Sequence, residues 1–187
     1  MTPIFLVVGS PAVGKSTTAA ALARRFAKSI HIPVDALRDM VAAGQALPGP
    51  QWGDELIEQL AASRASAVFM ALTYRRAGFA VVIDDFWDPN SGLAEYAELF
   101  SQPQMHRVLL YPQQSAARAR NRQRAGSGGA AEYIDDGIGL VYAHLDTVVA
   151  SLQADGWLVL DTTELGVEDV VARILAPTEV VQISPCC

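Results

Sequence analysis

One short motif near the start of the chain constrains its fold and its chemistry more than any other feature. Residues Gly9 to Thr17 read GSPAVGKST and match the P-loop pattern G-x-x-x-x-G-K-[ST], directly after the apolar run 4–8. The apolar run predicts a strand and the Ala-rich segment after the loop predicts a helix, which is the context that this motif requires. We therefore expect the chain to bind a nucleoside triphosphate.

The residue types in this loop explain how it would hold a polyphosphate. Gly9 and Gly14 allow a tight turn, so that successive backbone N–H groups point toward phosphate oxygens. Lys15 supplies a positive charge for the β- and γ-phosphates, and the Ser16 hydroxyl is a candidate Mg²⁺ ligand. The helix that begins near Gly14 directs its positive end toward the same anion. The predicted nucleotide contacts are Gly9, Ser10, Pro11, Ala12, Val13, Gly14, Lys15, Ser16 and Thr17.

Length and composition indicate one soluble domain. The chain has 187 residues, of which 51% are hydrophobic and 18% are charged, and this is typical of a globular protein. Its apolar runs are much shorter than the roughly 18 residues of a membrane span, and its N-terminus has no secretory signal, so we expect no membrane partner. The two cysteines, Cys186 and Cys187, are adjacent and cannot crosslink the fold. We therefore expect a cytoplasmic location.

Apolar segments rich in β-branched residues alternate with helical patterns, which indicates an α/β fold with a mostly parallel sheet. The predicted strands are Ile4–Val8, Ser29–Pro33, Phe79–Asp84, Met105–Tyr111 and Trp157–Leu160. The predicted helices are Lys15–Ala27, 35–43, Asp54–Arg76, Leu93–Phe100, Gln113–Arg124, Glu132–Ala154 and Val167–Leu175. The Gly-rich segments 44–53 and 125–131 are expected to be flexible. We expect one domain over residues 1–177, with a lid at about 118–133 and a tail at 178–187.

Two charged residues follow the second predicted strand. Asp35 comes just after the strand and Arg38 comes three residues later, so the two share one face if a helix begins here. Side chains at the C-terminal edge of an open α/β sheet border the crevice in which ligands bind. Asp35 is therefore a candidate base for the proton of an attacking hydroxyl group, and Arg38 would orient the substrate. The alternative is that Asp35 only caps the helix.

Two adjacent aspartates, Asp84 and Asp85, end the third predicted strand. In P-loop folds an acidic residue at this place meets the Mg²⁺ shell. Neighbouring strand residues face opposite sides of a sheet, so the two carboxylates are expected to have different roles. We assign Asp84 to the metal, through water, and Asp85 to the substrate side; a turn or cap role for one of them is the alternative.

Four arginines, Arg118, Arg120, Arg122 and Arg124, form a basic cluster in a chain whose net charge is −6. Residues four apart share a helix face, so Arg120 and Arg124 lie together and the other two lie on nearly the opposite face. The cluster precedes segment 125–131, which is suited to a lid that closes over the triphosphate. One arginine pair would then stabilise charge on the transferred phosphoryl group. A solvated basic helix face is the alternative.

Two tryptophans and three histidines are the remaining residues with a candidate role. Trp52 and Trp87 are placed to stack on a substrate ring or to pack at the edge of the core. His31, His106 and His144 have no metal-ligand spacing between them, so we expect core or surface roles for all three.

The order of these motifs resembles that of a group of P-loop kinases that includes bacteriophage polynucleotide 5′-kinase, chloramphenicol phosphotransferase and the zeta toxins. The resemblance rests on GSPAVGKST, then Asp35-Ala-Leu-Arg38, then VVIDD, then RNRQR before a Gly-rich segment. The polynucleotide kinase pattern implies that Asp35 is the general base and that Arg38 orients the substrate. Its lid pattern, Arg-Asn-x-x-Arg, implies that Arg120 and Arg124 contact the nucleotide, although one extra residue here precedes the glycine.

The resemblance also implies a fold and a reaction. The implied fold is a three-layer α/β P-loop NTPase of the nucleoside-kinase type, with a five-stranded parallel sheet in the order 2-3-1-4-5 and a lid. The implied cofactors are ATP and Mg²⁺, and the γ-phosphate of ATP would move to a hydroxyl group. Because the chain is acidic, we expect a small-molecule acceptor rather than nucleic acid. The alternatives are a 5′-hydroxyl polynucleotide kinase and a P-loop ATPase without kinase activity.

Overall fold

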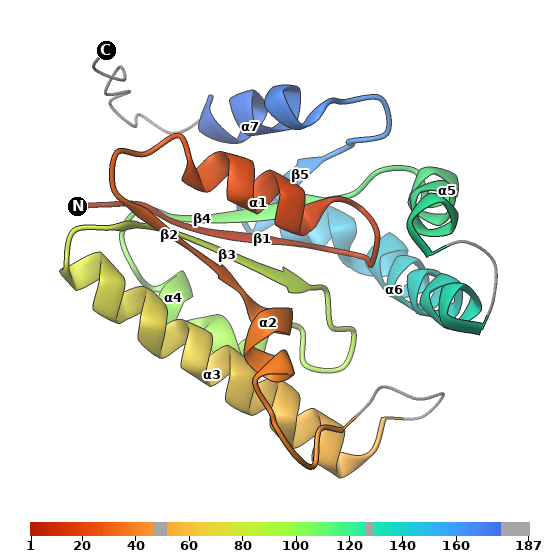
Figure 1. Ribbon diagram of the computed structural model, residues 1–187. Coiled ribbons are helices and arrows are strands. Elements are labelled where there is room, and N and C mark those ends of the chain that lie inside the picture. Colours follow the sequence, from red (N-terminus) through yellow and green to blue (C-terminus); the bar gives the residue numbers. More distant parts are fainter. Residues whose placement is uncertain (47–51, 126–128, 177–187) are drawn as a thin grey trace.

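The five predicted strands form one parallel sheet in the order β2-β3-β1-β4-β5 (Figure 1). The computed structural model describes residues 1–46, 52–125 and 129–176. The strands are β1 (Ile4–Gly9), β2 (Ser29–Pro33), β3 (Ala80–Phe86), β4 (Met105–Leu110) and β5 (Leu158–Leu160). The parallel pairing and the strand order confirm the predicted α/β P-loop kinase fold.

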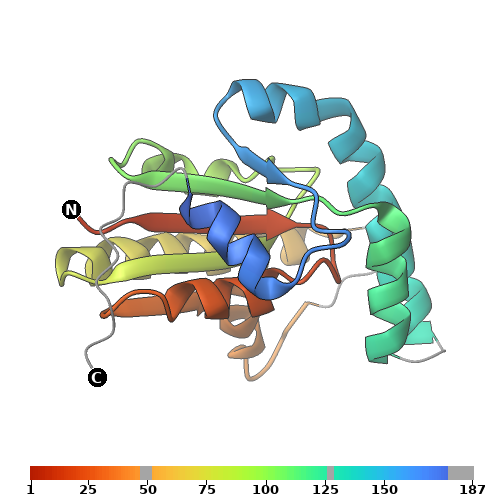
Figure 2. The same ribbon diagram turned by 90° about the horizontal axis from the view of Figure 1, so that it is seen from above.

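Helices cover both faces of this sheet, as Figures 1 and 2 show. The helices are α1 (Lys15–Ala23), α2 (Val34–Asp39), α3 (Asp54–Arg76), η1 (Ala94–Tyr96), α4 (Ala97–Phe100), α5 (Gln114–Ala125), α6 (Gly129–Ala154) and α7 (Val167–Leu175). Helices α1 and α7 lie on one face, and α3 and α4 lie on the other. Helix α5 and the first part of α6 lie beyond the C-terminal ends of the strands.

The central strand β1 is buried along its whole length, which explains its uninterrupted apolar sequence. Alternate side chains point to opposite faces of the sheet. Ile4, Leu6 and Val8 pack in the core that α3 and α6 cover. Phe5 and Val7 pack in the core that α1 and α7 cover. One strand thus joins two hydrophobic layers and fixes the position of the loop that follows it.

The register of the strands brings the candidate site residues to one edge of the sheet. Gly9, at the end of β1, is in register with Phe86 at the end of β3. Pro33, at the end of β2, is in register with Asp84. Because the strands are parallel, the loops after β1, β2 and β3 all leave from this edge, where ligands bind in open α/β sheets.

The predicted strands lie within one or two residues of those observed, but several helices differ from prediction. Helix α1 ends at Ala23, whose carbonyl oxygen accepts a hydrogen bond from Ser29 Oγ at 2.6 Å. Helix α2 already ends at Asp39. The predicted helix at 93–100 is divided into η1 and α4, and Leu93 before it has a left-handed backbone with φ of 64°.

Parts of the predicted flexible segments, 47–51 and 126–128, lie outside the described residues. The predicted tail, with Cys186 and Cys187, also lies outside them. Among the helices that the structure describes, none combines the length and the apolar character needed to cross a membrane.

Candidate active site

The loop between β1 and α1 has the backbone geometry that its sequence predicts. A Cβ atom on Gly9 would lie 2.5 Å from the Leu110 carbonyl oxygen and 2.9 Å from Val13 Cγ2, so only glycine fits there. Gly14, at the N-cap of α1, has φ of 96°, a value that side chains disfavour. The N–H groups of the first turn of α1 therefore lie at the loop, which is the arrangement that binds phosphate.

Lys15 occupies the first position of α1, and its ammonium group donates a hydrogen bond to the Ser10 carbonyl oxygen at 2.9 Å. Burial lowers the pKa of Lys15 below its usual value of 10.5, because the charged form loses solvation. Four other charged side chains act on this ammonium group: Asp35, Asp84, Asp85 and Arg124. The predicted acidic residues and one predicted lid arginine thus lie within electrostatic range of the P-loop lysine.

Ser16 and Asp84 lie next to each other across this site. The Ser16 hydroxyl donates a hydrogen bond to Asp84 Oδ2 at 2.6 Å. The other carboxylate oxygen, Oδ1, contacts His31 Nε2 at 2.5 Å. A hydroxyl and a carboxylate are the oxygen ligands that Mg²⁺ prefers, so this pair fits the metal that a P-loop site uses. The metal role of both residues stays a prediction.

Asp35 and Arg38 lie in α2, directly after β2. Asp35 is in the first turn of the helix, and Pro33 is the N-cap, so Asp35 is not the capping residue. The Asp35 side chain is 70% exposed, and its Oδ1 lies 3.9 Å from Arg38 Nη1. Arg38 is more enclosed and also donates to the Ala46 carbonyl oxygen at 3.4 Å. An exposed carboxylate beside an anchored arginine leaves Asp35 accessible to an acceptor.

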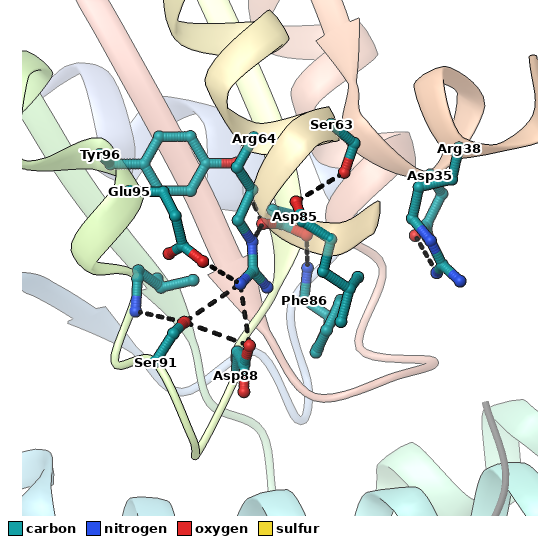
Figure 3. A network of polar contacts seen from close by, with 12 residues as sticks. Asp35, Arg38, Ser63, Arg64, Asp85, Phe86, Asp88, Ser91, Glu95 and Tyr96 are labelled. Atoms are coloured by element: carbon teal, nitrogen blue, oxygen red, sulfur yellow. Dashed lines mark hydrogen bonds and ion pairs between the residues drawn. The ribbon is translucent and has the colours of Figure 1, made fainter. Parts of the chain in front are cut away.

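Asp85 faces the interior, in a network of polar contacts that Figure 3 shows. Its Oδ2 lies 2.7 Å from Arg64 Nε, and neither side chain is exposed. Arg64, from α3, donates to side-chain oxygens of Asp85, Asp88, Ser91 and Glu95. The network therefore links α3, the end of β3 and η1.

Both carboxylate oxygens of Asp85 accept hydrogen bonds from protein groups. Oδ2 also accepts from the Tyr96 hydroxyl at 3.0 Å, and Oδ1 accepts from the Phe86 N–H at 2.8 Å. Burial raises the pKa of Asp85 to about 6, and the contacts with Arg64 and Tyr96 oppose that increase. The predicted substrate-side role of Asp85 is untested, and the structure adds an internal role in holding the strand end.

Arg120 borders a cleft beside the P-loop. Its guanidinium group donates to Val13 O at 3.3 Å and to Thr162 O at 2.8 Å, so it joins the loop to the segment before α7. The cleft is lined by Val13, Gly14, Thr17, Thr18, Arg120, Thr162, Leu165, Gly166, Val167 and Val170. Its position next to the first turn of α1, with both apolar and polar walls, suits a nucleotide base.

The predicted lid corresponds to the end of α5 and the start of α6, which pair at the edge of the sheet (Figure 2). Asn121 in α5 donates to Asp135 in α6 at 2.7 Å. Arg118 lies beside Gly139 of α6, on a different side of α5 from Arg120. Arg124 is exposed, and its charge reaches Lys15. Closure of this lid stays a prediction.

Sequence reasoning missed Arg64 and His31 as site residues. Arg64 lies on the same buried face of α3 as Leu60 and Ala67. A charged residue at helical spacing among apolar residues is the sequence feature that could have identified it. His31 reaches Asp84 because of the register of β2 against β3, and the implied strand order does not specify that register.

The sheet, the loop and the Ser16–Asp84 contact together define a P-loop nucleotide-binding protein with a kinase-like fold. A family model described as an AAA domain, AAA_33, matches residues 4–139, and the chain belongs to this family. No curated protein matches the chain.

Solved structures with similar folds include several kinases. A tunicamycin resistance protein from Deinococcus radiodurans is 18% identical, covers 99% of this chain and 100% of its own, and has a TM-score of 0.65. A gluconokinase from Sinorhizobium meliloti is 16% identical, with coverages of 93% and 90% and a TM-score of 0.63. A shikimate kinase from Acinetobacter baumannii, in complex with shikimate, is 17% identical, with coverages of 94% and 92% and a TM-score of 0.63. These likenesses show the P-loop kinase fold and leave the predicted polynucleotide kinase group unconfirmed.

Proposed function

We propose that this protein is an ATP-dependent phosphotransferase that moves the γ-phosphoryl group of ATP to a hydroxyl group of a small-molecule acceptor. The observation that carries the proposal is the 2.6 Å hydrogen bond from Ser16 to Asp84, next to Lys15 in the P-loop. A phosphate-binding loop, a metal pair and an accessible carboxylate are the parts that this reaction needs. We also propose that the enzyme acts in the cytoplasm.

Each part has a defined task in this proposal. The loop amides of residues 9–17 hold the phosphates, and Lys15 neutralises their charge. Mg²⁺, held by Ser16 and, through water, by Asp84, would supply further positive charge at the phosphates. Asp35 accepts the proton of the acceptor hydroxyl, and Arg38 positions that acceptor.

The two lid arginines have different places in the proposal. Arg120 is already tied to the P-loop backbone and borders the cleft that suits the base. Arg124 is exposed and its charge acts on Lys15, so it would reach the transferred phosphoryl group when the lid closes.

The acceptor end of the site favours a small molecule over a nucleic acid. Asp35 lies in the first turn of α2, directly after β2, whose last residue Pro33 is in register with Asp84. The nearby Arg64 is shared among three carboxylates, those of Asp85, Asp88 and Glu95. A polynucleotide would need cationic groups along its phosphodiester backbone, and Arg64, which is buried and paired with these carboxylates, is not available to one.

The proposal is tested by measuring ADP release with Mg²⁺ and ATP over a panel of acceptors. The panel contains uncharged sugars and polyols, amino sugars, nucleosides, and a 5′-hydroxyl oligonucleotide at low salt. We expect a small hydroxylated compound to stimulate ADP release and to appear as its phosphate ester. Stimulation by the oligonucleotide alone would establish a polynucleotide kinase instead. ADP release that no acceptor changes, with free phosphate as the product, would establish an ATPase.

A further inference from the structure

His31, in the neighbouring strand β2, contacts the carboxylate that we assign to the metal. Its Nε2 lies 2.5 Å from Asp84 Oδ1. His31 is in β2, where its register partner in β3 is Val82, two residues before Asp84. Residues two apart on a strand face the same side, so His31 and Asp84 are diagonal neighbours on one face of the sheet.

Asp84 is therefore held by both of its oxygens. Ser16 donates to Oδ2 and His31 contacts Oδ1, and the Asp84 side chain is only 5% exposed. The two partners come from different parts of the fold, because Ser16 begins α1 and His31 is in β2. Together they leave the carboxylate little freedom to rotate.

We propose that His31 is a positioning residue that orients the Asp84 carboxylate for the metal ion. The proposal rests on the metal role that the proposed function gives to Ser16 and Asp84, and it does not depend on the identity of the acceptor. Groups that hydrogen-bond to metal ligands fix the orientation of those ligands, and losing them weakens metal binding by about 10- to 100-fold. His31 does this through Asp84 and need not touch the nucleotide or the acceptor.

A purely structural role for His31 predicts a different result. In that case, removing the ring would lower the stability of the sheet and leave metal affinity unchanged. His106 provides a matched control, because it is also a strand histidine and its ring stacks on Phe5 with centroids 4.8 Å apart. The variant His106→Leu should lower stability without affecting the metal.

The experiment measures Mn²⁺ binding to the full-length protein in the presence of a non-hydrolysable ATP analogue, by the EPR signal of free Mn²⁺. We expect His31→Leu to raise the dissociation constant of Mn²⁺ by about 10- to 100-fold. In EDTA, the dissociation constant of the analogue should stay within about twofold of the wild-type value, which corresponds to a change of less than about 0.5 kcal/mol. His31→Gln, whose amide nitrogen reaches a position close to that of Nε2, should restore most of the Mn²⁺ affinity.

The outcomes separate this inference from the proposed function. Asp84→Asn and Ser16→Ala should both weaken Mn²⁺ binding, and if neither does, the metal assignment itself is wrong. If both weaken it while His31→Leu matches His106→Leu, only the inference about His31 fails. Thermal unfolding checks that each variant is folded. If His31→Leu does not fold, His31→Phe replaces it, because phenylalanine keeps an aromatic ring at this position without a nitrogen that can contact Asp84.

Discussion

Arg64 and Asp85 form an ion pair with Nε and Oδ2 2.7 Å apart, in which neither side chain has any exposure to solvent. The same guanidinium group contacts Asp88 and Glu95. Ion pairs are costly to bury, but a buried pair that loses one partner is left with an uncompensated charge. The arrangement therefore makes the long helix α3 and the end of β3 dependent on each other.

Replacing Arg64 with leucine should strongly destabilise the fold. The change leaves the carboxylates of Asp85 and Asp88 buried without their cation, and we expect a loss of about 3–5 kcal/mol in the free energy of unfolding. Urea denaturation followed by circular dichroism measures it. Arg76→Leu, at the exposed end of the same helix, is the control and should change stability by less than about 0.5 kcal/mol. Equal effects of the two substitutions would contradict the structural role of the network.

The two lid arginines should affect different quantities, Arg120 the affinity for the nucleotide and Arg124 the rate of phosphoryl transfer. Arg120→Ala removes hydrogen bonds to Val13 and Thr162 at the cleft, so nucleotide affinity should fall by about tenfold, which corresponds to 1.4 kcal/mol. Arg124→Ala should leave nucleotide affinity nearly unchanged and lower kcat by about 10³-fold. Isothermal titration with an ATP analogue and steady-state kinetics separate the two effects. If Arg124→Ala lowers only affinity, its assigned role in the transition state is wrong.

Gly9 should not tolerate even a methyl group. The Cβ atom of Gly9→Ala would overlap the Leu110 carbonyl oxygen and the Val13 side chain, so the loop must shift. We expect a destabilisation of about 1–3 kcal/mol and loss of nucleotide binding. Gly137→Ala in α6 is a matched control, because its Cβ would meet nothing within 4 Å. That control should be neutral or stabilising by up to about 1 kcal/mol, as alanine favours helices.

Lys15 should lower the stability of the protein that has no nucleotide bound. Its pKa in the folded state is lowered by burial, so the unfolded chain holds this proton more tightly than the folded protein does. Below the unfolded pKa the charge therefore opposes folding, and that penalty disappears as the pH rises toward 10.5. Lys15→Met should be more stable than wild type at pH 7, by a margin that narrows at higher pH, and should not bind ATP. A less stable Lys15→Met at pH 7 would contradict this.

Much of the fold was predictable because it depends on local patterns. Uninterrupted apolar runs mark buried parallel strands, and the motif GSPAVGKST defines the turn between the first strand and the first helix. Helix α3 was predicted with its observed bounds, since a long amphipathic segment ends at Gly78, which has φ of 83°. The lengths of α1 and α2 depend on hydrogen bonds from later residues, such as Ser29, and were predicted less well.

The site was predictable only where a motif fixes the chemistry. The loop residues and Asp84 were named from the motif and from the end of a strand, and the structure places Ser16 in contact with Asp84, while their roles stay predictions. The internal partners of Asp85 were not predictable, because they depend on where α3 packs against the strand end. The contact between His31 and Asp84 likewise depends on the register of β2 against β3, which the predicted strand order does not specify.

The most direct test of the proposed function compares wild type with Asp35→Asn, using whichever hydroxylated compound most stimulates ADP release. The measurement follows formation of ADP and of the phosphorylated acceptor, together with the dissociation constant for ATP. We predict that the variant loses at least about 10²-fold in transfer, since a general base contributes roughly 10²–10⁴-fold, and keeps its affinity for ATP. Transfer at the wild-type rate in Asp35→Asn would contradict the assignment of Asp35 as the group that accepts the proton of the hydroxyl.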